Sequence, residues 1–223
     1  MTGLGESLGR RGEDLLEALG ETGYMLVVSL AAAVVLGLPL GMLVYLTRRG
    51  GTAPNRVVWW VGNLFINIVR SFPFLLLVVF LIPVTRLVYG TTFGTPAATF
   101  SLCFVAVAIY ARLVEQILRE INPGIPRVAR TMGATLPQTI VRFLLPEAIP
   151  GLVYALTSAT ISLLSYSTVL GVVGGGGIGD FALRYGYQEY DYPLMYFTIA
   201  VILAVVLIVQ SIGHRLSVRL DHR

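Results

Sequence analysis

The sequence predicts an all-α integral membrane protein with five transmembrane helices, its N-terminus outside and its C-terminus inside the cell. Hydrophobic residues make up 56% of the chain and charged residues 13%, well below the roughly 25% charged residues of soluble domains. The mean hydropathy is +0.79. Five windows are long and apolar enough to cross a bilayer, because a spanning helix needs about 20 mostly apolar residues. The arginines are shared unequally between the connections of these windows.

The expected spans are residues 22–47, 57–85, 93–114, 148–173 and 192–213. Charge-free windows underlie four of them, whereas the second span carries Arg70 near its middle. We expect the second span to be one long helix kinked near Pro73. The alternative is an interfacial stretch around Trp59 and Trp60, followed by a span that begins at Phe72.

The arginine distribution orients the five spans. Eleven arginines lie in the connections after spans one and three and in the C-terminal tail. Four lie in the N-terminal tail and the other two connections, namely Arg10, Arg11, Arg86 and Arg184. Because cytoplasmic loops carry an excess of basic residues, residues 121–147 and the tail 216–223 are expected in the cytoplasm. Residues 1–21 then form an extracytoplasmic tail, and residues 22–215 form the transmembrane domain.

The N-terminal tail does not resemble a cleavable signal peptide, since it is acidic and the apolar run after it is too long. Its leucines alternate with glutamates and an aspartate. An amphipathic helix on the outer surface and a disordered extension are both compatible with this pattern.

The region 121–147 is too long and too regular for a simple connector. Pro126 suits the first turn of a short helix, and Gly133 suits a left-handed cap that ends it. Thr135 and Gln138 match a capping box that opens a second helix through Phe143. Pro146 is then expected to close the unit before span four. Such a unit forms a compact docking knob, in which the small residues Ala129, Gly133 and Ala134 let a partner come close; the alternative is an amphipathic loop on the lipid headgroups.

All 16 basic residues are arginine, so the chain contains no phosphate-binding loop of the GxxxxGK[ST] type. If solute moves uphill at the expense of ATP, another chain must bind the nucleotide. A G-x-G-x-x-G match at Gly174, Gly176 and Gly179 follows a membrane helix rather than a strand, which excludes the dinucleotide-binding context. The glycines, including Gly175 and Gly177, are expected either to form an outer gate that caps a pathway or to form an ordinary flexible loop.

The region 121–147 resembles the coupling motif of binding-protein-dependent ABC importer permeases, E-A-A, three residues, G, nine residues, I-x-L-P. Here Arg127-Val128-Ala129 is followed after three residues by Gly133, and after nine more by Phe143-Leu144-Leu145-Pro146. The spacing is complete, but Arg127 replaces the motif glutamate and Phe143 replaces the isoleucine. The ion pair that the resemblance attributes to this glutamate, in contact with the ATPase, therefore has no acidic partner at position 127. The resemblance implies an ATPase-coupling surface formed by Arg127, Val128, Ala129, Arg130, Met132, Gly133, Ala134, Thr135 and Pro146.

Further segments are similar to the methionine-importer permease subfamily across roughly residues 24–215. They include Arg70-Ser71-Phe72-Pro73-Phe74, Met132-Gly133-Ala134-Thr135 and Tyr185-Gly186-Tyr187. The resemblance implies a homodimer in the bacterial cytoplasmic membrane that carries D- or L-methionine, with two cytoplasmic ATPase subunits and an extracytoplasmic, lipoprotein-type binding protein. ATP and magnesium would be bound by the ATPase partner, and no cofactor by this chain. A permease for another small amino acid or polar solute is the alternative.

Polar residues inside apolar spans are the candidates for the translocation pathway. Arg70 and Asn67 lie three residues apart in span two, and Asn63 lies on much the same helix face. In span four, Ser162, Ser165 and Tyr166 are expected near a pathway on the dimer axis. The alternatives are a snorkelling role for Arg70 and helix packing for the hydroxyl residues.

Other classes of protein fit less well. The four charge-free windows contain no histidine, aspartate or glutamate for an intramembrane enzyme or a metal site. The scattered arginines do not form the basic face that nucleic-acid binding requires. An ATP-independent channel or carrier remains an alternative, although neither needs a cytoplasmic docking knob.

Overall fold

The computed structural model describes residues 4–220, and all of its regular elements are helical. Most are α-helices, and three are π-helical turns, named η. In chain order they are α1 (Leu4–Ala32), η1 (Ala33–Gly37), α2 (Leu38–Thr47), α3 (Arg56–Ser71), α4 (Phe74–Tyr89), α5 (Thr95–Glu120), α6 (Gly124–Thr131), α7 (Leu136–Gln138), η2 (Thr139–Leu144), α8 (Leu145–Val172), α9 (Gly177–Phe181), η3 (Ala182–Gln188) and α10 (Tyr192–Leu220).

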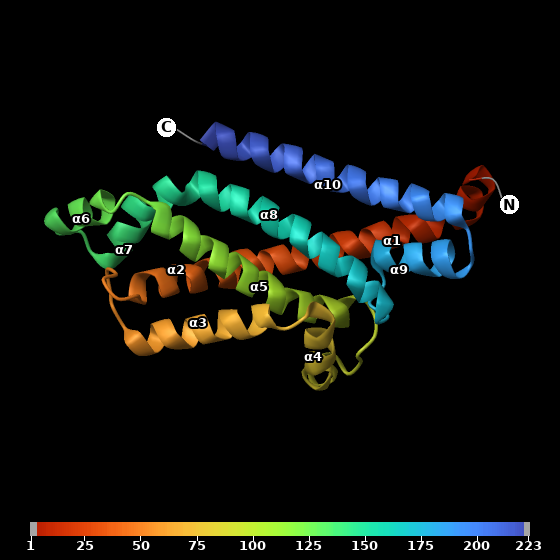
Figure 1. Ribbon diagram of the computed structural model, residues 1–223, viewed down its shortest axis with the longest axis horizontal. Helices are drawn as coiled ribbons and strands as arrows, with labels where there is room; N and C mark the ends of the chain where they lie inside the picture. The colour runs from red at the N-terminus through yellow and green to blue at the C-terminus, as the bar shows by residue number, and fades with distance from the viewer. Residues whose placement is uncertain (1–3, 221–223) are drawn as a thin grey trace.

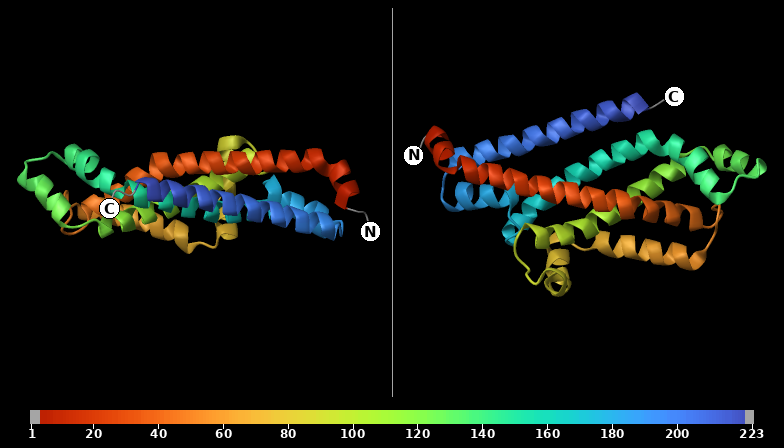
Figure 2. Two further views of the ribbon diagram at one scale, coloured as in Figure 1. Left: turned by 90° about the horizontal axis from the view of Figure 1, so that it is seen from above. Right: turned by 180° about the vertical axis from the view of Figure 1, so that it is seen from behind.

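The long helices form an elongated bundle, and α4 lies across it (Figure 1). One end of the bundle carries α6, α7 and the connection between α2 and α3, and the C-terminal end of α10 points toward it. The opposite end carries the start of α1, together with α9 and the start of α10. The views in Figure 2 show the same separation of the two ends.

The N-terminal region is helical from Leu4, with non-helical backbone angles at Arg11. Leu15 and Ala18 are buried against Phe181 and Leu194 of the α9–α10 region. Of the two expectations for the tail, the structure therefore has the helix. This helix runs on into the first span, so residue 22 marks no boundary between elements. Residues 1–3 lie outside the described part of the chain.

A π-helical turn directly precedes two of the prolines that lie within long helical segments. Pro39 follows η1 and Pro146 follows η2, in both cases two residues after the turn ends. A proline ring clashes with the carbonyl four residues earlier in an α-helix, and the wider π turn changes that spacing. The expectation that Pro146 ends a helix is therefore wrong. Helical structure is continuous over Leu136–Val172.

The second expected span is broken rather than kinked. Phe72 and Pro73 have extended backbone angles between α3 and α4, and the two helices are bent by 114°. A residue before proline avoids the helical region, so the helix stops at Ser71 instead of bending through Pro73. Within residues 4–220, four helices are long and apolar enough to cross a membrane, or five if the broken pair counts as one span.

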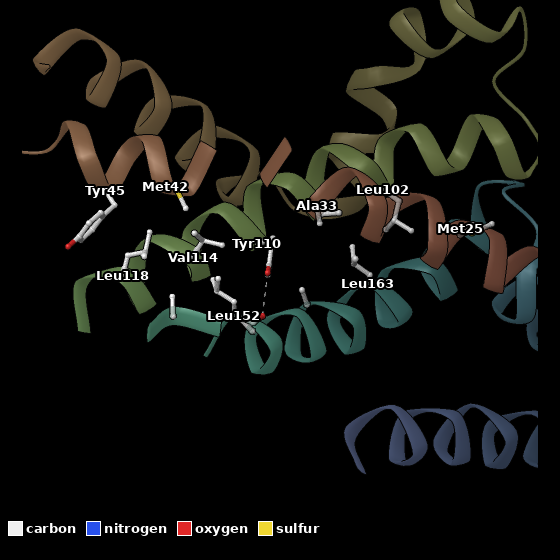
Figure 3. Packing of buried hydrophobic residues seen from close by; sticks show 14 of the residues in the cluster. Met25, Ala33, Met42, Tyr45, Leu102, Tyr110, Val114, Leu118, Leu152 and Leu163 are labelled. Carbon is white, nitrogen blue, oxygen red and sulfur yellow. Dashed lines mark hydrogen bonds between the residues drawn. The ribbon is translucent and has the colours of Figure 1, made fainter. Parts of the chain in front are cut away.

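Helix α5 is the centre of the packing. It contacts α1, η1, α2, α3, α4 and α8, and 14 of its residues are buried. Leu102, Val114 and Leu118 are fully buried in the main apolar cluster (Figure 3). The Tyr110 hydroxyl donates a hydrogen bond of 3.3 Å to the carbonyl of Leu152, which links α5 to α8.

Helix α10 is peripheral by comparison. It packs on α8 and η3, and its buried residues are Leu194, Thr198 and Gly213. A Cβ at Gly213 would fall within the space of the Thr157 side chain, so this glycine lets α10 approach α8 closely. Most of the remaining α10 surface is apolar and exposed.

Candidate functional site

The turn around Gly133 has the geometry of a Schellman cap. Gly133 has a φ of +71°, its N–H donates to the carbonyl of Arg130 at 3.0 Å, and the N–H of Ala134 donates to the carbonyl of Ala129 at 3.0 Å. These two bonds satisfy the last carbonyls of α6. The predicted left-handed cap is confirmed, and because α6 starts at Gly124, Pro126 lies in its first turn as predicted.

The next helix opens as its sequence predicts. Thr135 is the N-cap of α7, and the Gln138 side-chain oxygen accepts a hydrogen bond of 2.8 Å from the Thr135 N–H. This is the glutamine half of a capping box. Together with the Gly133 turn, it fixes the path of the chain between α6 and α7.

Apolar side chains on this unit are exposed. Val128 is 52% exposed, Met132 70%, Leu136 39% and Val141 61%; we call these four residues the apolar tip. Arg127, Arg130 and Arg142 are exposed on the same unit. An exposed apolar set with a charged border is typical of protein interaction sites.

Not every residue of the expected docking surface belongs to it. Ala129 is fully buried, so it lets α6 pack against η2 rather than admitting a partner. Gly133 is exposed with open space beside its Cα, Ala134 is half-buried, and Thr135 and Pro146 are exposed. The Arg130 guanidinium donates a hydrogen bond of 2.9 Å to the carbonyl of Gly51, so the unit is tied to the α2–α3 connection.

A polar network joins α3 to α5. The Arg112 guanidinium donates to the side-chain oxygens of Asn63 at 3.1 Å and Asn67 at 2.6 Å. It also pairs with Glu115, which in turn accepts from Arg119 at 2.5 Å. The expectation that Asn63 and Asn67 share the environment of Arg70 is not borne out by these bonds, since both amide oxygens accept from Arg112.

Glu115 is the buried acidic residue at the centre of this network. Its side chain is 1% exposed. A buried charge is tolerated when it is paired and hydrogen-bonded, and two guanidinium groups supply this pairing. Arg112, Glu115 and Arg119 occupy positions i, i+3 and i+7 of one helix face, a signal from which the sequence could have revealed the network.

Arg70 lies apart from this network. It is exposed in the last turn of α3, just before the break to α4, and forms no ion pair within residues 4–220. A cation is favourable at the C-terminal end of a helix because of the helix dipole. Arg70 therefore lies at the break between α3 and α4, whereas Asn67 is bound to Arg112 of α5.

The candidate residues of α8 differ in exposure. Ser162 is half-buried and Ser165 is exposed, and their hydroxyls donate to the carbonyls of Ser158 and Ile161 in the same helix. The Tyr166 ring lies 4.7 Å from the ring of Phe74, between centroids. The two serines therefore need no partner from another helix, and Tyr166 packs against the start of α4.

The glycine-rich turn after α8 is fastened to α1. The Glu21 carboxylate accepts hydrogen bonds of 2.6 Å from the Gly177 N–H and from the Thr95 hydroxyl. The Thr22 hydroxyl accepts from the N–H of Ile178 at 2.8 Å. This turn thereby connects α1, α5 and α9.

The glycines of this turn serve two different purposes. Gly174, Gly176 and Gly177 have φ values of +77°, +75° and +84°, which favour glycine. Gly175 and Gly179 are buried, and a Cβ at Gly179 would collide with the backbone of Thr168. Such close packing favours an ordered turn over the flexible loop that the sequence also allowed.

The described residues offer no metal centre: within residues 4–220, no group of three or more histidine, cysteine, aspartate or glutamate side chains is placed to hold a metal ion.

The chain is similar to known proteins in both sequence and fold. Residues 33–223 match the family described as binding-protein-dependent transport system inner membrane component. The chain is 43% identical to the probable D-methionine transport system permease protein MetI of Vibrio cholerae, over 94% of this chain and 93% of that protein. It is 37% identical to the methionine import system permease protein MetP of Bacillus subtilis, over 94% and 95% of the two chains.

A solved structure is similar in fold as well as in sequence. A chain of the MetNI methionine ABC transporter, in an inward-facing conformation, superimposes with a TM-score of 0.90 at 38% identity. The match covers 93% of this chain and 96% of that chain.

Proposed function

Because the chain belongs to the family of binding-protein-dependent transport system inner membrane components, we propose that it is the permease subunit of an ABC importer for methionine. Relatives that cover more than nine-tenths of the chain are named as methionine or D-methionine permeases, which supports this solute. The solute is D- or L-methionine, and the membrane is the bacterial cytoplasmic membrane. This multi-pass protein supplies the pathway, and a separate ATPase binds ATP and magnesium.

The ends of the bundle support an orientation with the N-terminus outside and the C-terminus inside. The α2–α3 connection, the α6–α7 unit and the C-terminal end of α10 share one end in Figure 1, and these segments hold most of the arginines. An excess of arginine favours the cytoplasmic side. Under this orientation, residues 121–147 face the ATPase and the glycine-rich turn faces the binding protein.

The single observation that carries the proposal is the α6–Gly133–α7 unit with its apolar tip. We expect the ATPase to dock on Val128, Met132, Leu136 and Val141, with Arg127 and Arg130 beside them. Movement of the docked ATPase then reaches α8 directly, because helical structure is continuous from Leu136. It reaches the α2–α3 connection through the bond from Arg130 to Gly51.

The pathway is proposed to lie between two copies of the chain. Ser165 is exposed on α8 and Ser162 and Tyr166 lie beside it, which fits a lining that a second subunit completes. Arg70 and Asn67 contribute polar groups near the α3–α4 break. Gly174–Gly179 form the outer gate, held by Glu21, and alternating access opens the pathway to one side at a time.

The test is reconstitution of the chain with its ATPase and binding protein in liposomes. We expect uptake of labelled methionine that requires ATP and the binding protein. Gly133→Trp forces a bulky residue into a left-handed position, so it should distort the apolar tip, release the ATPase on co-purification and abolish uptake. Flux without ATP would instead establish a channel or carrier, whereas ATP-driven uptake of a different solute would overturn the methionine assignment alone.

A further inference from the structure

A cavity of about 720 Å³ lies where α2 ends and α3 begins. None of the described residues that line it is acidic. Its lining includes four arginines and both tryptophans of the chain, namely Arg48, Arg49, Arg56, Arg119, Trp59 and Trp60. The composition of the wall favours an anionic ligand that also has apolar parts.

The arginines of this cavity are unequally engaged by the protein. Arg119 pairs with Glu115, and Arg48 lies over the ring of Tyr45 at 4.4 Å. Arg48, Arg49 and Arg56 form no ion pair within residues 4–220, so all three add uncompensated positive charge to the cavity. Because Arg48 is held against Tyr45, the guanidinium groups of Arg49 and Arg56 are the two that have neither an ion pair nor a ring contact in this part of the chain. Arginine matches phosphate geometry well, because its planar fork donates two parallel hydrogen bonds.

The wall also contains a hydrogen-bond donor that the protein leaves unused. The indole Nε1 of Trp59 is buried and has no hydrogen-bond partner in the described part of the chain. A buried donor without an acceptor costs free energy, and Tyr and Trp are enriched where a membrane protein meets the headgroup layer. Trp59 and Trp60 thus mark the level of that layer.

An apolar stripe leads out of the cavity along α3. Val57, Trp60, Val61, Leu64 and Ile68 are each at least 40% exposed and follow the i, i+3, i+4, i+7, i+11 spacing of one helix face. At 1.5 Å per residue the stripe is about 16 Å long. Trp60 belongs both to the cavity and to the stripe, so the two surfaces are continuous.

We infer that this cavity and stripe bind an anionic phospholipid, with the phosphate between Arg49 and Arg56 and an acyl chain along α3. A free phosphate or another soluble anion would bind in the cavity but would leave the apolar stripe uncovered. An apolar helix from another protein would cover the stripe but would leave the arginines without an anionic partner. An acidic amphiphile satisfies both surfaces, in the way that basic pockets between membrane helices bind acidic headgroups. The inference does not depend on which solute the protein carries.

The two tryptophans allow a direct test, since the intrinsic tryptophan fluorescence of the chain comes entirely from the cavity wall. The full-length protein is reconstituted in bilayers of phosphatidylcholine and phosphatidylglycerol, with brominated acyl chains on one lipid at a time as the quencher. We expect brominated phosphatidylglycerol to quench the tryptophan fluorescence several-fold more strongly than brominated phosphatidylcholine at the same mole fraction. Each single variant, Arg49→Gln or Arg56→Gln, should lower this preference by up to about fivefold, and the double variant should leave the two lipids nearly equal as quenchers.

Arg219→Gln is the matched control, because Arg219 is an exposed arginine in the last turn of α10, away from the cavity. It should keep the preference, as should the charge-retaining variant Arg49→Lys with Arg56→Lys. Equal quenching by the two lipids in the unaltered protein would overturn the inference. A loss of preference in Arg219→Gln equal to that in the double glutamine variant would also overturn it, as would abolition of the preference by millimolar inorganic phosphate.

Discussion

The two ends of the bundle each contain a glycine turn with positive φ, but they use it differently. At Gly133 an added Cβ would meet nothing within 4 Å, whereas at Gly179 it would collide with the main chain of Thr168. The first turn points the apolar tip outward, and the second packs α9 against α8 and α1. At Gly133 glycine is therefore required for its backbone angle alone, whereas the second turn needs that angle at Gly174, Gly176 and Gly177 and also the small volume of glycine at Gly179. The comparison teaches that a glycine-rich motif predicts neither flexibility nor exposure by itself.

Gly179→Ala should have the largest effect on stability. Helix propensity alone favours alanine by about 1 kcal/mol, but the added methyl group would push the backbone of α9 away from the backbone of Thr168 in α8. We expect a net loss of about 3 kcal/mol, measured by thermal unfolding of the detergent-solubilised protein. An unchanged unfolding temperature would show that the turn is loosely packed and would remove the contrast between the two ends.

Glu21→Ala should come next, since it removes the acceptor for the Gly177 N–H and the Thr95 hydroxyl. A buried or half-buried donor left without its acceptor costs about 1–3 kcal/mol. Glu17→Ala is the matched control, because Glu17 is exposed on the same helix. Equal unfolding temperatures for these two variants would contradict the proposed role of Glu21 in fastening the turn.

Gly133→Ala should cost less, about 1–2 kcal/mol, because the penalty is the left-handed backbone alone. Gly133→Asn should cost less still, since asparagine tolerates this conformation better. Unfolding measurements on the pair separate strain from crowding. If alanine and asparagine destabilise equally, the cost at Gly133 does not come from its backbone angle.

Met132→Ser should change stability least, within about 0.5 kcal/mol, because the side chain is an exposed surface residue. Its effect should appear instead in the amount of ATPase that co-purifies, with at least a tenfold loss expected if Met132 is a central contact. Leu16→Ser, an equally exposed residue of α1, should retain the ATPase. If the two variants retained equal amounts of ATPase, Met132 of the apolar tip would not be a docking contact.

Local features of the fold were predictable from the sequence because they depend on neighbours in the chain. The Gly133 cap and the Gln138 contact to Thr135 follow from short-range backbone geometry. The apolar windows of spans one, three, four and five all lie in long helices. The position of a change in direction near Pro73 was predicted, but it was expected as a kink within one helix. The break and its angle depend on how α3 and α4 pack, which no local pattern contains.

The errors concern packing between elements. Pro146 was expected to stop a helix, and the π turn before it allows the helix to continue. Ala129 was expected on the docking surface, but burial depends on which face of α6 meets η2. Glu115 joins Arg112 to Arg119 and, through Arg112, α5 to α3, and this network becomes visible when the facing asparagines are known.

The bond from Arg130 to Gly51 has a consequence for genetic studies of this protein. Its acceptor is a main-chain carbonyl, so a residue of any type at position 51 carries the accepting group. Suppressor screens and covariation between paired positions detect a contact when both partners vary. In this link between the α6–α7 unit and the α2–α3 connection, Arg130 is the partner that contributes a side chain. Methods that rely on paired substitutions will therefore underestimate how closely the two segments are joined.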